Sequence, residues 1–239
     1  MTVSEFFSRA LSYVYRKTLR RVLPVCRYVK YNEVKVEPVR SLDKCFSYFP
    51  KQMADIPNYE DAIVDALEQY VQPGDTVTVI GGGYGVSVVK ALQKIGKDGK
   101  LFCYEGSKEY CKYVNETIGY NEHFVDKQHV TVANYFVGSA QHVYGHYGRS
   151  LPIEELPICD VLELDCEGSE KLILPRLLHK PRTIIVETHG IYGASTKEVR
   201  NILEKMGYDV VVERVAERNH FEVCVKNDIM VLVAVKMKS

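Results

Sequence analysis

A glycine-rich segment in the first half of the chain could let the backbone approach a ligand closely. It reads Gly81-Gly82-Gly83-Tyr84-Gly85 and lies between an apolar run and an amphipathic one. Glycine has no Cβ, so such a segment can turn sharply and bring its N–H groups against a ligand. Glu105, the next acid at the end of an apolar run, could accept hydrogen bonds from both hydroxyls of a ribose. Together these two features predict a site for a cofactor that contains a nucleoside.

Acidic residues and a histidine follow two later apolar runs. Asp165, Glu167 and Glu170 come directly after the first run, and Glu187 and His189 end the second. If the two runs are adjacent parallel strands, about 4.8 Å apart, these side chains meet at one edge of a sheet. There they could act as a general base or hold a divalent cation. The alternative for any one of them is structural, such as capping a short helix or pairing with an arginine.

The elements that must position these residues alternate between strands and helices. Apolar, β-branched runs bounded by turn residues predict buried strands, and apolar residues spaced three or four apart predict helices. Ser195 and Glu198 have the spacing of a capping box, and Gly207 ends the helix that they begin. The predicted strands are 76–80, 101–105, 129–135, 160–165, 182–188, 208–215 and 229–237. The predicted helices are 59–71, a stretch ending at Gly96, one opened by Ser107, a short one interrupted by Pro175 and one after Ser195.

This alternation predicts an α/β fold with a Rossmann-like, doubly wound and mostly parallel sheet of seven strands. The last two strands follow each other with no predicted helix between them, so we expect them to be antiparallel neighbours at one edge. In open sheets of this kind, ligands bind outside the carboxyl ends of the strands, near the point where the strand order reverses. The glycine segment and both acidic groups are predicted to lie there.

The N-terminal part, residues 1–50, is expected to extend a domain formed by residues 51–239. Residues 3–23 begin as an amphipathic helix, and residues 31–40 read as a short strand in which a proline favours an edge position. The first 30 residues carry seven basic side chains and one acid. We interpret the helix as packing against the domain. The alternative is peripheral contact with an anionic membrane through residues 1–23.

The amino-acid composition limits where in the cell the protein is expected and what it is expected to bind. Hydrophobic residues make up 46% of the chain and charged residues 26%, as in ordinary globular proteins. Basic and acidic residues balance at 31 each, so no overall positive field favours nucleic acid. Seven cysteines form no C-x-x-C pair, and no apolar run has the length of a membrane span or the form of a signal peptide. A cytoplasmic protein with reduced thiols is expected.

The spacing of the glycines separates two classes of nucleotide-binding protein. A dehydrogenase fingerprint, G-x-G-x-x-G, would need its third glycine at Val86 or Val88. The chain instead has G-x-G-x-G at positions 81, 83 and 85, which resembles motif I of the S-adenosylmethionine-dependent methyltransferases. Over roughly residues 55–210 the chain is similar to the FkbM-type methyltransferases. The blocks that carry this resemblance are Tyr59-Glu60, Pro73-Gly74-Asp75, the glycine segment, Glu105, Asp165-x-Glu167-Gly168-x-Glu170 and Glu187-x-His189.

The resemblance implies the seven-stranded methyltransferase fold and O-methylation of hydroxyls on small molecules and sugars, with S-adenosylmethionine as cofactor. We expect Asp165, Glu187 and His189 to activate the acceptor, as a metal-free base in preference to a divalent-cation site. The family has an acid two residues before the first glycine, where this chain has Val79. In the family this acid orients the loop amides and helps to hold the methionine ammonium of the cofactor. Here, either the cofactor binds more weakly or another carboxylate makes the ammonium contact. The implied cofactor-binding residues are Gly81, Gly82, Gly83, Tyr84, Gly85, Glu105, Gly106, Ser107 and Asp165.

Two other functions fit parts of the sequence. A non-catalytic binding module with the methyltransferase fold would explain Val79 and the basic N-terminal helix. A nucleotide-binding oxidoreductase would explain the glycine segment, but no Tyr-x-x-x-Lys dyad stands late in the chain. Methylation of nucleic-acid amino groups is disfavoured, because Asp165-Cys-Glu-Gly occupies the place of the usual [Asn/Asp]-Pro-Pro-[Tyr/Phe] motif. The expected partner is therefore a small-molecule or glycan acceptor and not a nucleic acid.

Overall fold

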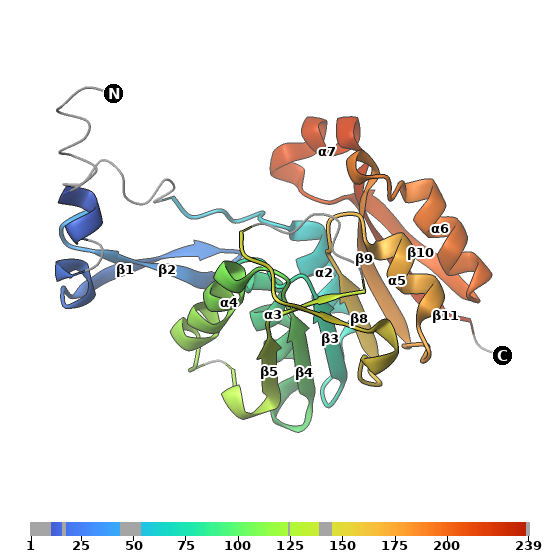
Figure 1. The fold of residues 1–239 in the computed structure, drawn as a ribbon, viewed down its shortest axis with the longest axis horizontal. Coiled ribbons are helices and arrows are strands. Elements are labelled where there is room, and N and C mark those ends of the chain that lie inside the picture. Colours follow the sequence, from blue (N-terminus) through green and yellow to red (C-terminus); the bar gives the residue numbers. More distant parts are fainter. Residues whose placement is uncertain (1–10, 16–17, 44–53, 124, 139–144, 238–239) are drawn as a thin grey trace.

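A seven-stranded sheet forms the centre of the computed structural model, which describes residues 11–15, 18–43, 54–123, 125–138 and 145–237 (Figure 1). The strand order is β10-β11-β9-β8-β3-β4-β5. All neighbours are parallel except β11, which runs antiparallel to both β9 and β10. The strands are β3 (Thr76–Ile80), β4 (Lys100–Tyr104), β5 (Val130–Ala133), β8 (Val161–Leu164), β9 (Thr183–His189), β10 (Tyr208–Val215) and β11 (Ile229–Lys236). This arrangement confirms the predicted fold class.

The order of the strands reverses between β3 and β8. The chain moves outward from β3 through β4 to β5, and then returns to the other side of β3 to form β8. The carboxyl ends of β3 and β8 therefore flank the switch point, where open α/β sheets bind their ligands.

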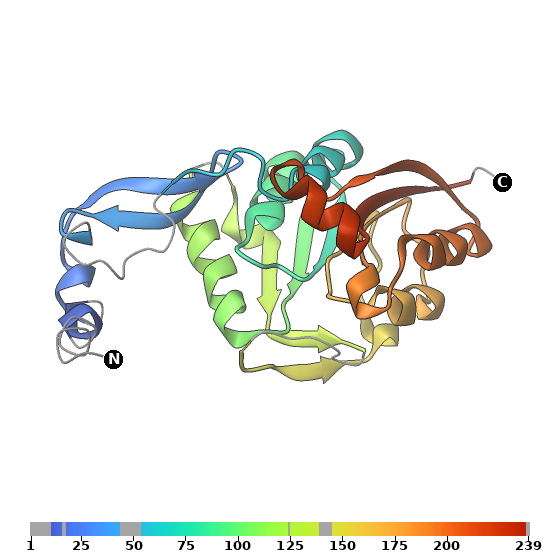
Figure 2. The same ribbon diagram turned by 90° about the horizontal axis from the view of Figure 1, so that it is seen from above.

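Helices cover both faces of the sheet (Figure 2). One apolar core joins one face of the sheet to α2, α3 and α4, and a second joins the other face to α5 and α6. Ser195 caps α6 by accepting a hydrogen bond from the backbone N–H of Glu198, as predicted. The helices are α2 (Asp61–Tyr70), α3 (Val86–Ile95), α4 (Lys108–Tyr120), α5 (Glu170–Ile173), α6 (Thr196–Lys205) and α7 (Phe221–Asn227).

Three short elements differ from the sequence prediction. The strand expected over 129–135 ends at Ala133, because the Asn134 side chain donates hydrogen bonds to the carbonyls of Glu105 and Gly106 at 2.9 and 3.1 Å. The chain then forms β6 (Tyr135–Val137), which pairs with β7 (Arg149–Leu151) outside the main sheet. Helix α7 lies between β10 and β11, where no helix was expected. It spans only seven residues and buries only Cys224, too little for a periodic pattern.

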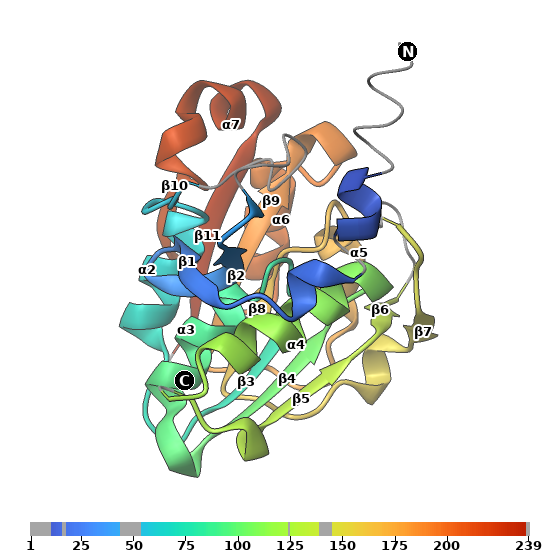
Figure 3. The same cartoon turned by 90° about the vertical axis from the view of Figure 1, so that its left-hand side faces the viewer.

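The N-terminal region contains a hairpin that projects from the side of the sheet occupied by α4 (Figures 1 and 3). Its strands are β1 (Val25–Tyr31) and β2 (Val34–Arg40). The predicted strand therefore has an antiparallel partner that the sequence pattern did not indicate. The helix expected over 3–23 does not extend that far. Residues 11–15 are helical, and a 3-10 turn at Leu19–Arg21 ends the segment; residues 1–10 lie outside the described part.

Specific polar contacts hold the hairpin in place. The buried carboxylate of Asp43 lies 3.0 Å from Arg20 Nε and accepts a hydrogen bond from the Tyr15 hydroxyl at 2.8 Å. Asn121, at the end of α4, bonds both the N–H and the carbonyl of Lys35 in β2. The proposed domain boundary at residue 50 lies outside the described residues. Among those described, no helix has the length and apolar character needed to cross a membrane.

Candidate functional site

The glycine segment connects β3 to α3 in a conformation that requires glycine at defined points. Gly81, Gly83 and Gly85 have φ angles of 97°, 50° and 83°, which lie in the region that other residues rarely adopt. A Cβ on Gly81 would lie 1.7 Å from the carbonyl oxygen of Asp165. The absence of a side chain at Gly81 therefore allows the loop to contact the end of β8 at the switch point.

Glu105 fixes the shape of this loop from the end of β4. One carboxylate oxygen accepts hydrogen bonds from the N–H groups of Gly82 and Gly83 at 2.8 and 3.0 Å, and the other accepts from Ser107 N–H at 2.7 Å. Burial raises the pKa of Glu105, although these three hydrogen bonds oppose the rise. The predicted ribose contact stays a prediction; what the structure shows is a carboxylate that orders the loop amides.

The other residues predicted to bind the cofactor surround Glu105. Ser107 caps α4 by accepting a hydrogen bond from Tyr110 N–H, and the Gly106 carbonyl accepts one from Asn134. Tyr84 lies on the loop and is 36% exposed. Polar groups of the backbone and side chains that follow β3 and β4 therefore surround the glycine loop.

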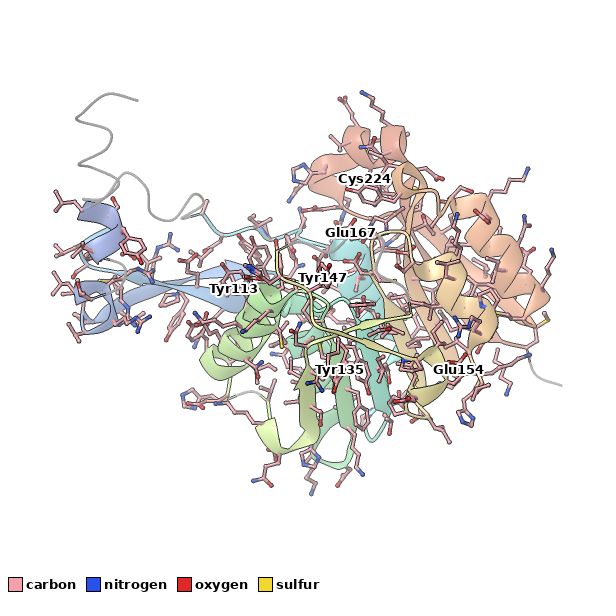
Figure 4. The ribbon with its side chains drawn as sticks, viewed as in Figure 1. Tyr113, Tyr135, Tyr147, Glu154, Glu167 and Cys224 are labelled. Atoms are coloured by element: carbon pink, nitrogen blue, oxygen red, sulfur yellow. The ribbon has the colours of Figure 1, made fainter. Side chains whose placement is uncertain are left out.

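Tyr84 belongs to a cluster of five tyrosines that the sequence did not reveal. Its ring centre lies 5.5 Å from that of Tyr110 and 5.6 Å from that of Tyr113, both on α4. It also lies 5.8 Å from that of Tyr31 in the N-terminal hairpin and 6.1 Å from that of Tyr59. The N-terminal extension therefore contributes an aromatic side chain beside the glycine loop. Figure 4 shows Tyr113 where α4 meets the hairpin.

Asp165, Glu187 and His189, the predicted catalytic residues, lie together at the carboxyl ends of β8 and β9. One potential ligand atom from each lies within 4.8 Å of the other two. His189 Nε2 is 3.5 Å from an oxygen of Asp165, 3.5 Å from one of Glu187 and 3.6 Å from one of Glu167. We call these four residues the rim cluster. Figure 4 shows Glu167 above the upper ends of the central strands.

Glu170 has a different role from the other acids of its motif. It is fully buried in α5, and one of its carboxylate oxygens lies 2.8 Å from His189 Nδ1. The same oxygen accepts hydrogen bonds from the backbone N–H groups of Cys166 and Gly168. Glu170 thereby fixes the orientation of the imidazole and directs Nε2 toward the carboxylates of the rim cluster.

The ionisation of the rim cluster reflects burial and crowding of charge. Burial lowers the pKa of His189, but the hydrogen bond to Glu170 and the charges of Asp165, Glu170 and Glu167 outweigh it and raise that pKa to about 9. Burial raises the pKa of Asp165 to about 6, against the opposing effect of His189. Burial and the charge of Asp165 also raise the pKa of Glu187 well above its usual value.

Two further carboxyl groups lie close to the rim cluster. Glu163, in the middle of β8, is fully buried, and neither of its carboxylate oxygens has a hydrogen-bond partner within the described ranges. Glu60 precedes α2 with a φ of 46°, and its Oε1 is 3.9 Å from where a Cβ on Gly83 would lie. Burial and the charge of Asp165 raise the pKa of Glu60 to about 8. A charged residue inside an otherwise apolar strand was the signal that could have identified Glu163.

Comparisons with known proteins add a likeness in fold. No family model matches the chain, and no curated protein matches it. A SAM-dependent methyltransferase from Aquifex aeolicus is 15% identical, with a TM-score of 0.48 over 73% of this chain and 89% of that one. A precorrin-6y C5,15-methyltransferase from Geobacter metallireducens is 15% identical, with a TM-score of 0.49 over 82% and 96%. A tRNA methyltransferase from B. subtilis is also 15% identical, with a TM-score of 0.47 over 73% and 65%.

The substrates named for these proteins differ from one another, and one is a nucleic acid. Because no family model matches the chain, the FkbM resemblance stays a prediction, and so does the expectation that no nucleic acid is bound. The basis for a function lies in the chain's own site residues.

Proposed function

We propose that the chain is an S-adenosylmethionine-dependent O-methyltransferase that acts on a hydroxyl of a small molecule or sugar-like acceptor. The observation that carries the proposal is the meeting of the glycine loop and the rim cluster at the switch point. Asp165 belongs to both, because its carbonyl contacts Gly81 while its carboxylate faces His189. A cofactor on the loop and an acceptor at the rim would therefore be neighbours.

The loop has features that fit this cofactor. A Cβ would lie 1.7 Å from a protein atom at Gly81 and 2.7 Å from one at Gly82, so neither position has room for a side chain, and at Gly85 it would lie 3.0 Å from Val114 Cα. Gly83 is less crowded, because the nearest atom to its Cβ position is Glu60 Oε1 at 3.9 Å. A ligand can approach the backbone at Gly83, and the carboxylate of Glu60 lies next to it. Glu60 is our candidate for the contact that Val79 cannot make.

The residues of the rim cluster supply what a methyl transfer to oxygen requires. S-adenosylmethionine, when bound, provides a methyl group on a sulfonium. The reaction is an in-line displacement, so holding the acceptor in near-attack geometry provides much of the rate. A neutral hydroxyl is a weak nucleophile, and its proton must be accepted or its charge stabilised as it reacts. Asp165, Glu187 and His189 offer carboxylate and imidazole groups for that task, and Glu170 holds His189 in position.

The tyrosine cluster supports an acceptor with a ring. Ligand sites are lined mainly by apolar and aromatic side chains with a few polar groups that set the orientation. Tyr84 and Tyr113 are partly exposed, stack at 5.6 Å and stand beside the loop. Their hydroxyls could bond a polar acceptor while their rings pack on its faces.

Transfer of a radiolabelled methyl group from S-adenosylmethionine to a panel of sugars and hydroxylated metabolites tests the proposal. We expect turnover with at least one hydroxyl acceptor. Asp165→Asn, Glu187→Gln and His189→Gln should each reduce kcat, with at least one falling by about 10²–10⁴-fold, the usual range for loss of acid–base assistance. Near-normal turnover in all three variants would show that the rim cluster is structural. Cofactor binding with no transfer to any acceptor would instead favour a non-catalytic binding module.

A further inference from the structure

We propose that Asp165, Glu187 and His189 bind one divalent cation, of a kind that accepts both oxygen and nitrogen ligands, such as Mn²⁺. The site is defined by the chain's own residues, but its purpose rests on the proposed function, since the cation would bind the acceptor oxygen and stabilise its negative charge. This mechanism replaces the metal-free base expected from the sequence.

The distances within the rim cluster are slightly longer than those of groups around a shared ion, and the ligand atoms of Asp165, Glu187 and His189 all lie within 4.8 Å of one another. His189 Nε2 lies 3.5–3.6 Å from oxygens of three carboxylates, which is beyond the 2.7–3.2 Å range of N–H···O hydrogen bonds. Ligand atoms held about 2.1 Å from one ion, at angles of roughly 90–110°, are separated by about 3.0–3.4 Å. Small side-chain movements would therefore convert this arrangement into a coordinated one.

The histidine is oriented as a metal ligand would be. Its Nδ1 lies 2.8 Å from the buried carboxylate of Glu170, which leaves Nε2 directed at the rim carboxylates. Metal-binding histidines commonly direct their second ring nitrogen at a carboxylate in this way, which fixes the ring and increases its basicity. Glu170 is thus a positioning residue for the proposed site.

Charge around the site is unbalanced. Across the described ranges, no lysine or arginine lies within ion-pair distance of Asp165 or Glu187, and His189 is the only cationic partner of either. Glu163 adds a fully buried carboxyl whose two oxygens lack hydrogen-bond partners within those ranges. It stands in β8, two residues before Asp165, which directly follows the last residue of the strand. Buried carboxyl groups normally pair with cations, coordinate metals or stay protonated, and a divalent ion would take the place of the protons.

The ligand set indicates the class of ion. Carboxylates suit Mg²⁺ and Mn²⁺, whereas imidazole is typical of transition metals. Mn²⁺ tolerates both and is paramagnetic, so it serves as the probe.

Titration of the chelator-treated full chain with Mn²⁺ alone, followed by the electron paramagnetic resonance of the free ion, tests the site without cofactor or acceptor. We expect one bound Mn²⁺ per chain. Asp165→Asn and Glu187→Gln should each weaken binding by at least tenfold, and Glu170→Gln by roughly 10–100-fold. The matched control is Asp126→Asn, because Asp126 and His129 also form an acid–histidine pair at 3.5 Å, but an isolated one on the surface. It should leave Mn²⁺ binding unchanged.

Thermal unfolding of the same proteins separates loss of the site from loss of the fold. Mn²⁺ should raise the Tm of the wild type and of Asp126→Asn, but not that of a folded Asp165→Asn. No binding up to millimolar Mn²⁺, or equal binding in wild type and both rim variants, would overturn the site. Mn²⁺ binding in a chain that does not bind S-adenosylhomocysteine would uphold the cation site and remove the proposed function. Binding of S-adenosylhomocysteine without binding of Mn²⁺ would uphold the proposed function and remove the cation site.

Discussion

At the scale of single residues, three carboxyl groups lie on segments near Val79. Val79 is fully buried in β3, and its partner in the parallel register of β8 is Glu163. Glu105 orders the loop amides from β4, and Glu60 stands beside Gly83 from the segment before α2. The acids near this part of β3 thus come from neighbouring segments of the chain. Glu60 is the one next to the open side of the loop.

Substitution of Glu60 should therefore weaken binding of the amino-acid part of the cofactor only. We expect Glu60→Gln to weaken binding of S-adenosylhomocysteine by about 10–100-fold, since hydrogen bonds to charged groups contribute about 1.5–3 kcal/mol. Binding of 5′-methylthioadenosine, which lacks the amino-acid part, should be unchanged. Calorimetry with both ligands measures this. An equal loss for the two, or no loss for either, would remove Glu60 from the ammonium contact.

At the scale of elements, strand β8 carries the buried carboxyl group of Glu163, which should lower the stability of the folded protein. Glu163 has no hydrogen-bond partner within the described ranges, and burial raises its pKa well above the usual value. An unsatisfied buried polar group costs about 1–3 kcal/mol. Such a cost within a strand that leads to a site is typical of a functional constraint.

Replacing Glu163 by the apolar residue of similar length tests that cost. Glu163→Met should increase the free energy of unfolding by about 1–3 kcal/mol, and it should weaken Mn²⁺ binding. Leu162→Met, on the opposite face of the same strand, is the control and should give no increase. Denaturant unfolding of both variants measures the difference, and a destabilised Glu163→Met would mean that the carboxyl has a stabilising partner.

The buried charge pair of Arg20 and Asp43 is one of the contacts that hold the N-terminal hairpin. Burial raises the pKa of Asp43, but hydrogen bonds from Arg20, Arg40 N–H and Tyr15 outweigh it and hold that pKa below its usual value. The stabilisation from Asp43 is therefore present above its unfolded pKa, near 4, and is lost as the pH falls through the lowered folded value.

Asp43→Asn should destabilise the hairpin by about 3 kcal/mol at neutral pH, because it leaves Arg20 without its buried partner. Hydrogen exchange of the amides of β1 and β2 measures this, and the gap to wild type should close in acid. The control is Asp55→Asn, which removes an exposed pair with Arg27 and should cost less than about 1 kcal/mol. Equal protection in Asp43→Asn and wild type would show that the hairpin is held by other contacts.

At the scale of the whole molecule, the sequence predicted what local pattern determines. Runs such as 76–80 and 182–188 are β-branched and apolar, so their strands were found to within a residue or so. The meeting of Asp165, Glu187 and His189 followed from the common edge of parallel strands. The contact of Tyr31 with Tyr84 and the pairing of Glu170 with His189 depend on side-chain directions between distant segments, which spacing does not encode. Spacing likewise did not indicate that the Glu105 carboxylate accepts hydrogen bonds from the amides of the glycine loop.

Isothermal titration of the wild-type chain with S-adenosylhomocysteine, and separately with NADH, tests the central claim most directly. The loop at Gly81–Gly85, the carboxylate of Glu105 and the rim cluster predict binding of S-adenosylhomocysteine and none of NADH. Glu105→Ala should weaken that binding by at least tenfold, because the loop amides lose the group that orders them. No heat of binding at millimolar S-adenosylhomocysteine, or binding of NADH in its place, would contradict the assignment.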